Sequence, residues 1–169
     1  MQKNFKQLLN DVTCFVFDVD GVLTDGSLIL MPDGEQLRTM NIKDGYAMQL
    51  AVKKGFKMAV ISGGKSEAVR SRLKKLDIHD VYLGIQNKPD TFDEFLLTHN
   101  IKPENVLCMG DDMPDYEIMK RAGIPVCPND AASEIKNISV YVSDKKGGNG
   151  CVRDVIEQVL KVQGKWEVS

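Results

Sequence analysis

The sequence has 169 residues and a mass of 18.8 kDa, a length typical of one compact domain and too short for two large ones. Hydrophobic residues make up 43% and charged residues 27%, which predicts a folded core and excludes a disordered chain, a collagen and a coiled coil. The net charge of -2 and the pI of 5.7 argue against nucleic acid binding, because that function favours a basic surface.

The sequence also bears on location and redox state. No apolar run approaches the roughly 20 residues that cross a bilayer, and residues 1–11 lack the apolar centre of a secretory signal. The cysteines form no CxxC pair, so we expect reduced thiols, mostly buried, rather than disulfides or zinc ligands, at Cys14, Cys108, Cys127 and Cys151. These features predict a chain without membrane association and, by default, a cytoplasmic location.

Short apolar strands alternate with helical segments from the start of the chain. We predict a strand at 13–17, followed by a hairpin whose strands cover 27–31 and 36–40. A helix capped by Asp44 and stopped by Gly55 comes next, then a strand at 57–61.

The second half of the chain repeats this alternation. We predict a helix at 66–76, a short strand at 81–83 and a helix opened by Pro89. The remaining predicted elements are a strand at 105–109, a helix from Pro114, a strand at 125–127, a helix at 131–136, a strand at 139–142 and a helix from about Val152.

This order predicts an α/β fold: a doubly wound, mostly parallel open sheet, Rossmann-like, with an extra hairpin. No repeat or linker interrupts the pattern, so we expect a single domain over residues 1–169. In such sheets ligands bind beyond the carboxyl ends of the strands. The residues that follow each strand are therefore the candidates for chemistry.

Polar side chains follow several of the predicted strands. They are Asp18 and Asp20 after the first strand, Ser62, Gly63 and Gly64 after the second core strand, Lys88 before the third core helix, and Gly110, Asp111, Asp112 and Asp115 further on. Alone, each has an ordinary interpretation as a turn, a helix cap or a surface lysine. Together at one sheet edge they supply oxygen ligands for Mg²⁺, and a hydroxyl and a cation for a phosphoryl group.

These residues, in this order, resemble the four-motif signature of the haloacid dehalogenase superfamily of phosphatases. Nearly the whole chain further resembles one subgroup, the 3-deoxy-D-manno-octulosonate (KDO) 8-phosphate phosphatases. That second resemblance is carried by residues 23–26, 41–46 and 147–153.

The resemblance implies a Mg²⁺-dependent phosphomonoesterase that releases KDO and phosphate in lipopolysaccharide sugar biosynthesis. Asp18 would be the nucleophile that forms an aspartyl-phosphate, and Asp20 would act first as general acid and then as general base. Ser62 and Lys88 would bind the phosphoryl oxygens. The implied metal ligands are Asp18, the backbone carbonyl of Asp20, and Asp111, with Asp112 and Asp115 supporting these ligands without touching the metal.

The resemblance also implies a set of residues that bind the sugar-acid phosphate. They are Asp20, Asn41, Ile42, Lys43, Asp44, Gly45, Ser62, Gly63, Arg72 and Lys88. Gln49 and Gly64 occupy positions where some close relatives carry arginine. The contact to the substrate carboxylate is accordingly weaker, rearranged, or supplied by Lys43 or Lys65.

The length of the chain leaves no room for a cap domain between the motifs, so closure of the site has to come from elsewhere. The resemblance implies a homotetramer that is assembled by the hairpin of residues 27–40, with a neighbouring subunit completing each active site. Arg153 is expected either to reach a neighbour's site or to be a solvated charge at a helix start.

Three other functions compete with this one. The closest is a phosphatase for the nine-carbon homologue 2-keto-3-deoxynononate 9-phosphate. A phospho-receiver signalling domain would carry its acceptor aspartate after the third strand, where residues 83–87 contain no acid. A silent phosphatase-like regulatory domain is disfavoured because every motif residue is present.

Overall fold

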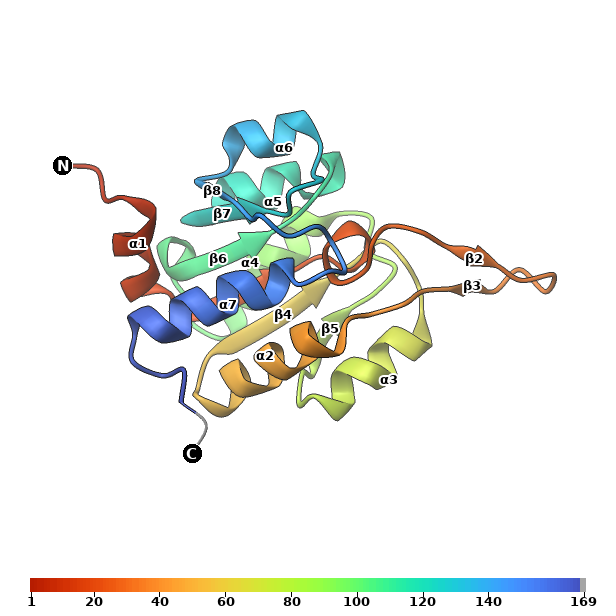
Figure 1. The fold of residues 1–169 in the computed structure, drawn as a ribbon. Coiled ribbons are helices and arrows are strands. Elements are labelled where there is room, and N and C mark those ends of the chain that lie inside the picture. The colour runs from red at the N-terminus through yellow and green to blue at the C-terminus, as the bar shows by residue number, and fades with distance from the viewer. Residues whose placement is uncertain (168–169) are drawn as a thin grey trace.

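The computed structural model describes residues 1–167, which fold around one parallel sheet of six strands, ordered β5-β4-β1-β6-β7-β8 (Figure 1). All five neighbouring pairs are parallel, which confirms the predicted α/β class. The strands are β1 (Cys14–Phe17), β4 (Lys57–Ile61), β5 (Asp80–Tyr82), β6 (Val106–Met109), β7 (Ile124–Cys127) and β8 (Tyr141–Val142).

Helices cover both faces of the sheet. One face packs against α2 (Ile42–Lys53), α3 (Glu67–Lys75), α7 (Cys151–Val162) and the N-terminal α1 (Phe5–Leu8), and the opposite face against α4 (Lys88–Thr98), α5 (Tyr116–Arg121) and α6 (Ser133–Ile138). Alternate residues of β1 divide between the two cores, because successive side chains of a strand point to opposite faces. This explains the nearly continuous apolar runs in the sequence.

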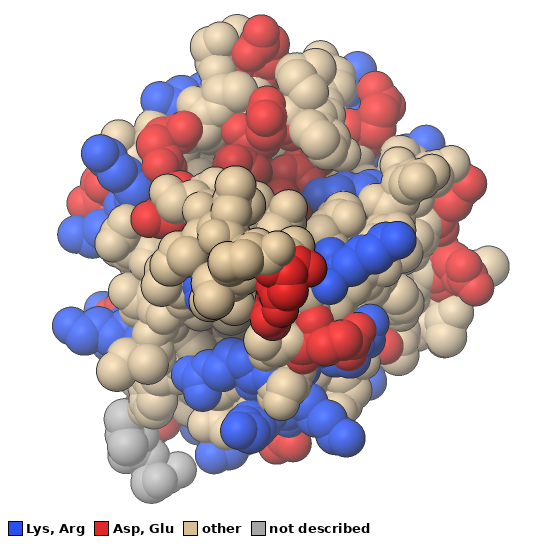
Figure 2. All heavy atoms as spheres, turned by 90° about the vertical axis from the view of Figure 1, so that its right-hand side faces the viewer, with Lys and Arg blue, Asp and Glu red and all other residues tan. Residues whose placement is uncertain are grey.

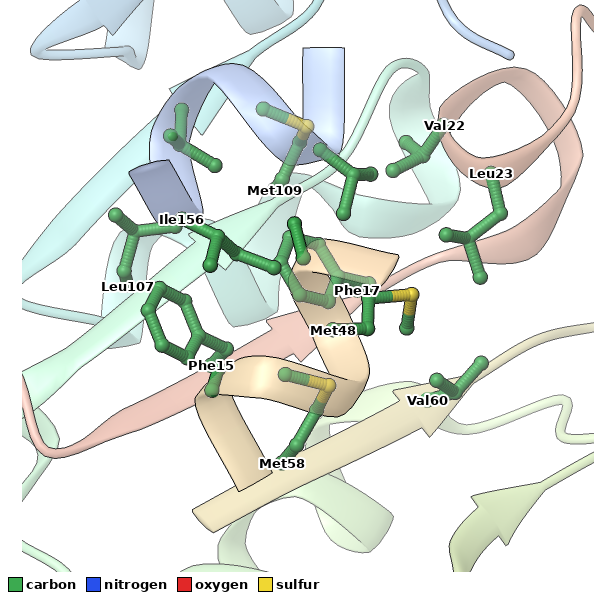
Figure 3. Close-up of a cluster of buried hydrophobic side chains, with 14 of the residues drawn as sticks. Phe15, Phe17, Val22, Leu23, Met48, Met58, Val60, Leu107, Met109 and Ile156 are labelled. Carbon is green, nitrogen blue, oxygen red and sulfur yellow. The ribbon is translucent and has the colours of Figure 1, made fainter. Parts of the chain in front are cut away.

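The larger core lies between the sheet and the helices α2 and α7 (Figure 3). Phe15 and Phe17 of β1 pack there with Met48 of α2, Met58 of β4 and Ile156 of α7. Complete burial of each phenylalanine contributes about 1.5–3 kcal/mol to folding. The strand that carries the candidate nucleophile at its end is therefore firmly anchored in the core.

The helix after the hairpin begins earlier than predicted. The side chain of Asn41 caps it by accepting hydrogen bonds from the backbone N–H groups of Lys43 (2.8 Å) and Asp44 (3.2 Å). The prediction that Asp44 is the cap is wrong, since Asp44 lies in the first turn and is 1% exposed. The helix ends before Gly55, whose φ of 93° is the left-handed conformation expected after a helix.

Several other boundaries differ by a few residues. The helix predicted from Pro114 starts at Tyr116, because Met113–Asp115 forms a turn of 3₁₀-helix first. The hairpin pairs only β2 (Ile29–Leu30) with β3 (Gln36–Leu37) and projects from the body of the molecule (Figure 1). Its turn contains Gly34 at a φ of 89°.

Two of the composition-based expectations can be checked in the structure. All four cysteines are free and buried, as predicted. Among residues 1–167, no helix combines the length and the apolar character needed to cross a membrane.

The order of the strands fixes where a ligand can bind. From β1 the chain moves outward through β4 and β5, then returns to the other side of β1 and moves outward through β6, β7 and β8. The order therefore reverses between β1 and β6. In open α/β sheets the crevice at such a switch point, beyond the carboxyl ends of the strands, is the ligand site.

Candidate active site

A cavity of about 650 Å³ lies at this switch point. Its lining includes eight of the residues that the sequence pattern assigned to the site: Asp18, Asp20, Ser62, Gly63, Lys88, Asp111, Asp112 and Asp115. Figure 2 looks onto this edge of the molecule and shows acidic side chains gathered in a recess beside the hairpin. Residues from four separate segments of the chain thus meet at one edge of the sheet.

Asp18 follows the last residue of β1 and is 8% exposed. One carboxylate oxygen accepts a hydrogen bond from the N–H of Val19 (2.7 Å) and lies 3.0 Å from the ammonium of Lys88. Burial raises the pKa of Asp18 well above its ordinary value, Asp115 raises it further, and Lys88 opposes both. The carboxylate is thus held in place at the cavity wall, and a cation bound beside it would favour its ionised form.

Lys88, the first residue of α4, joins two acids. Its ammonium donates to Asp115 at 2.7 Å as well as to Asp18, and its side chain is only 6% exposed. Burial alone would lower the pKa of Lys88, but the two carboxylates raise it above its ordinary value. A buried cation of this kind is suited to binding a phosphoryl oxygen.

Asp115 holds Asp111 as well. Its second carboxylate oxygen accepts a hydrogen bond from the N–H of Asp111 (3.1 Å), and no part of Asp115 is exposed. Gly110 makes this approach possible, since a Cβ there would lie 2.3 Å from the Cβ of Asp115. Asp115 therefore orients the loop that follows β6.

Oxygen atoms of Asp18, Asp111 and Asp115 lie within 4.8 Å of one another, a spacing that fits a divalent cation. Burial, followed by the charges of Asp115 and Asp112, raises the pKa of Asp111 to about 7. Because both oxygens of Asp115 already accept hydrogen bonds, Asp18 and Asp111 are the carboxylates best placed to take a metal. Two closely spaced carboxylates that are costly to ionise without a cation are the donor set expected of a Mg²⁺ site.

The loop after Asp18 is folded tightly against Asp111. Gly21 adopts a φ of 86°, and a Cβ at this position would lie 1.9 Å from the Oδ2 of Asp111. The buried hydroxyl of Thr24 accepts hydrogen bonds from the N–H groups of Gly21 and Gly26. Glycine is therefore required here both for its conformation and for the close approach of the carboxylate.

Ser62 follows β4 and is 2% exposed. Its hydroxyl accepts a hydrogen bond from the N–H of Gly64 (3.1 Å), and its carbonyl accepts one from Ile85 (3.0 Å). The hydroxyl oxygen is thus fixed at the cavity wall with its proton available for a ligand.

The carboxylate of Asp20 forms a two-point ion pair with Arg38, with N–O distances of 2.6 and 3.2 Å. Arg38 comes directly after β3 of the hairpin. Sequence reasoning missed this residue, because nothing in the local pattern connects a hairpin arginine to an acid eighteen positions earlier.

Of the ten residues expected to bind the sugar-acid phosphate, Asp20, Ser62, Gly63 and Lys88 line this cavity, and the other six do not. Asn41, Ile42 and Lys43 line a second cavity together with Arg153, and Arg72 lines a third cavity beside the hairpin. Asp44 and Gly45 are buried.

Asp44 and Arg153 contact each other and other residues of the same chain. Asp44 accepts a hydrogen bond from the N–H of Arg153 (2.9 Å), so it caps α7 from the neighbouring helix α2. The guanidinium of Arg153 lies over the rings of Tyr46 (5.9 Å) and Trp166 (5.2 Å) and pairs with Glu157. Within one chain, Arg153 is therefore paired and stacked, and its side chain is still 32% exposed.

Comparisons with known proteins identify similar sequences over most of the chain. A family of haloacid dehalogenase-like hydrolases matches residues 84–155. The 3-deoxy-D-manno-octulosonate 8-phosphate phosphatase of Salmonella typhi is 36% identical over 155 residues, which cover 92% of this chain and 82% of the relative.

Solved structures of phosphatases with the same name are also similar to this chain. The 3-deoxy-D-manno-octulosonate 8-phosphate phosphatase of Yersinia pestis aligns with a TM-score of 0.92 and 32% identity, over 95% of this chain and 86% of that chain. The enzyme of the same name from Moraxella catarrhalis, solved in complex with a magnesium ion, a phosphate ion and a KDO molecule, aligns with a TM-score of 0.90 and 30% identity. That alignment covers 94% of this chain and 91% of the other.

Proposed function

The chain belongs to the 3-deoxy-D-manno-octulosonate 8-phosphate phosphatase family of haloacid dehalogenase-like hydrolases, and from this premise we propose that it hydrolyses KDO 8-phosphate to KDO and phosphate. The observation that carries the proposal is the position of Asp18. Its carboxylate lies at the end of the central strand, in the wall of the cavity, 3.0 Å from a buried ammonium and beside a second carboxylate suited to a metal.

The reaction proceeds in two displacements at phosphorus. In the first, a carboxylate oxygen of Asp18 bonds to phosphorus while the bond from phosphorus to the sugar oxygen breaks. Asp20 enters this step in its protonated form and gives that proton to the departing alkoxide. In the second, water attacks phosphorus, Asp20 takes a proton from that water, and the bond to Asp18 breaks. Phosphate leaves and both aspartates return to their starting states.

Lys88 and Ser62 bind the phosphoryl group during both steps. The ammonium of Lys88 is fixed by Asp115, so it does not have to reorganise as charge moves over the phosphoryl oxygens. The hydroxyl of Ser62 donates to one of those oxygens. The same ammonium orients Asp18 before the attack.

Asp18 and Asp111, with the backbone carbonyl of Asp20, would hold Mg²⁺. The bound ion would reduce the repulsion between an anionic nucleophile and an anionic ester. Asp115 fixes the backbone of Asp111, and Asp112 caps the following turn by accepting a hydrogen bond from Met113 (2.8 Å).

We also propose a homotetramer in the cytoplasm, with the site completed by a neighbouring subunit. The support is the exposed apolar surface of the hairpin, where Ile29 is 56% and Leu30 is 73% exposed. In this assembly Asn41, Lys43 and Arg72, which lie outside the main cavity of one chain, bind the sugar acid across the subunit boundary.

Release of phosphate from purified esters tests the proposal. We expect turnover of KDO 8-phosphate in the presence of Mg²⁺ and loss of turnover with EDTA, restored by excess Mg²⁺. The nine-carbon ester 2-keto-3-deoxynononate 9-phosphate serves as the comparison, and a higher kcat/KM on that ester would reassign the substrate. Asp18→Asn is the matched control, because it keeps the size of the side chain and removes the nucleophile. Steady phosphate release by this variant would contradict the mechanism.

A further inference from the structure

Arg38 and Asp20 meet in a geometry that fixes both side chains. The guanidinium Nε donates to one carboxylate oxygen of Asp20 at 2.6 Å, and Nη2 donates to the other at 3.2 Å. The remaining nitrogen, Nη1, donates to the carbonyl of Gln36 in the hairpin at 3.2 Å. The side chain of Arg38 is 6% exposed, whereas that of Asp20 is 37% exposed. A two-point contact of this kind sets direction as well as distance.

The arginine approaches from outside the reaction cavity. Of the described residues, those lining that cavity include Asp20 but not Arg38, which lines the cavity between the hairpin and α3. Asp20 therefore separates Arg38 from the space in which the substrate ester would bind. This position suits a residue that acts on Asp20 rather than on the phosphoryl group.

Gly64 provides the space for this ion pair. A Cβ at Gly64 would lie 2.9 Å from the Nη2 of Arg38 and 3.2 Å from the Oδ2 of Asp20. Gly64 is not among the glycines with a positive φ, so its backbone conformation is open to other residues. The guanidinium of Arg38 occupies the space that a side chain at position 64 would fill, which explains the glycine there.

From these contacts we propose that Arg38 is a positioning residue, which holds the carboxylate of Asp20 in its working orientation and for which Gly64 leaves the necessary room. The inference rests on the proposed function, in which Asp20 protonates the leaving alkoxide. Because Arg38 is anchored to the hairpin through Gln36, the hairpin is mechanically linked to the acid–base group.

Two substrates with different leaving groups separate positioning from other roles. The alkoxide of a sugar phosphate needs a proton to depart, whereas the phenolate of p-nitrophenyl phosphate does not. For Arg38→Ala we expect kcat/KM on the sugar ester to fall by about 10- to 100-fold, and kcat/KM on p-nitrophenyl phosphate to change by less than about 3-fold. Arg38→Lys should recover part of the loss. Arg121→Ala, which removes an exposed arginine paired with Asp93, is the matched control and should change neither value.

A double-mutant cycle tests the link to Gly64. The atom closest to an added Cβ is the end of the flexible Arg38 side chain, so Gly64→Ala should displace the guanidinium and leave the fold intact. We expect Gly64→Ala to reproduce the selective loss of Arg38→Ala. In the Arg38→Ala background, the Gly64 substitution should add little.

Three results would overturn the inference. An equal loss on both substrates would indicate a structural role, and a rise in KM for the sugar ester at unchanged kcat would indicate direct substrate binding. Losses that multiply in the double variant would mean that Arg38 and Gly64 act independently. If the wild type rejects KDO 8-phosphate, the proposed substrate is wrong, but the same comparison applies to any other alkyl phosphate that the enzyme hydrolyses.

Discussion

Lys88 and Asp115 form an ion pair with an N–O distance of 2.7 Å, and their side chains are 6% and 0% exposed. The same ammonium lies 3.0 Å from Asp18, so one buried cation serves two buried carboxylates. Removing one partner of a buried ion pair leaves an uncompensated charge in a medium that solvates it poorly. The stability of the fold and the arrangement of the active site therefore depend on the same group.

We expect Lys88→Met to lower the free energy of unfolding by about 3–5 kcal/mol near neutral pH, because two carboxylates lose their counter-ion. Phosphatase activity should fall by at least about 100-fold. Adding Asp115→Asn removes one of the orphaned charges, so the double variant should regain much of the stability and none of the activity. Urea denaturation and phosphate release measure the two effects.

Lys161→Met is the control for this substitution. Lys161 forms an exposed pair with Glu157 on α7, and exposed pairs contribute at most about 1 kcal/mol. If the double variant is no more stable than Lys88→Met alone, the charge of Asp115 is not the source of the instability.

The affinity for Mg²⁺ should depend on pH through Asp111. Its pKa rises from 3.8 to about 7, with burial as the largest cause, so protons compete with the metal below about pH 7. We expect the dissociation constant for Mg²⁺ to decrease as the pH rises toward 7 and to level off above it. Isothermal titration calorimetry in buffers of different ionisation enthalpy would detect the released proton. A dissociation constant that is independent of pH would contradict this prediction.

The raised pKa of Asp111 also predicts how the free energy of unfolding of the metal-free protein depends on pH. The folded chain binds the proton of Asp111 more tightly than the unfolded chain does. The protonated group therefore contributes fully to the free energy of unfolding below pH 3.8, and this contribution is lost as the pH rises through about 7. Asp111→Asn should reduce that loss. Saturating Mg²⁺ should oppose it in the wild type, because the metal binds only the folded site.

The sequence was sufficient to predict the elements that depend on local patterns. Strand β4 has the predicted bounds, and the acids after β1 and β6 lie together because parallel strands share a carboxyl edge. The residue type of Asp44 predicts that it caps α2, but the structure shows Asn41 in that role. Two polar residues near a helix start cannot be ranked without knowing which backbone N–H groups each one reaches.

Local sequence patterns do not predict the contacts between segments that lie far apart in the chain. The pair of Arg38 and Asp20 depends on the angle at which the hairpin returns to the sheet, and no periodicity encodes that angle. Residues 147–153 carry the resemblance to the phosphatase subgroup, but no local pattern in the sequence indicates that Gly147 packs directly on the loop of Asp18. Such contacts are set by the tertiary fold.

Gly147 should be as sensitive to substitution as the catalytic loop itself. A Cβ there would lie 2.0 Å from the carbonyl oxygen of Gly21 and 2.9 Å from that of Thr24, and backbone atoms cannot move aside as a flexible side chain can. The φ of Gly147 is not positive, so alanine tests the contact rather than the backbone conformation.

We expect Gly147→Ala to destabilise the protein by about 3 kcal/mol and to lower kcat by more than about 10-fold, because the loop that orients Asp18 and Asp20 is displaced. Lys146→Ala, at the exposed neighbouring position, is the control and should retain both properties. Thermal unfolding and steady-state kinetics measure the effects. Wild-type kinetics in Gly147→Ala would show that the catalytic loop tolerates the displacement.

The apolar hairpin should govern assembly. Ile29 is 56% and Leu30 is 73% exposed, on a two-stranded hairpin that has little stability of its own. We expect the double substitution Ile29→Asp and Leu30→Asp to convert the assembled protein to a smaller species in light scattering while circular dichroism stays unchanged. Activity on the sugar ester should fall more than activity on p-nitrophenyl phosphate, because a neighbour would no longer contribute to sugar binding. Leu97→Asp, at an 84% exposed position on α4, controls for the loss of an exposed leucine. A wild-type protein that is monomeric at assay concentration, with full activity on the sugar ester, would contradict the role given to the hairpin.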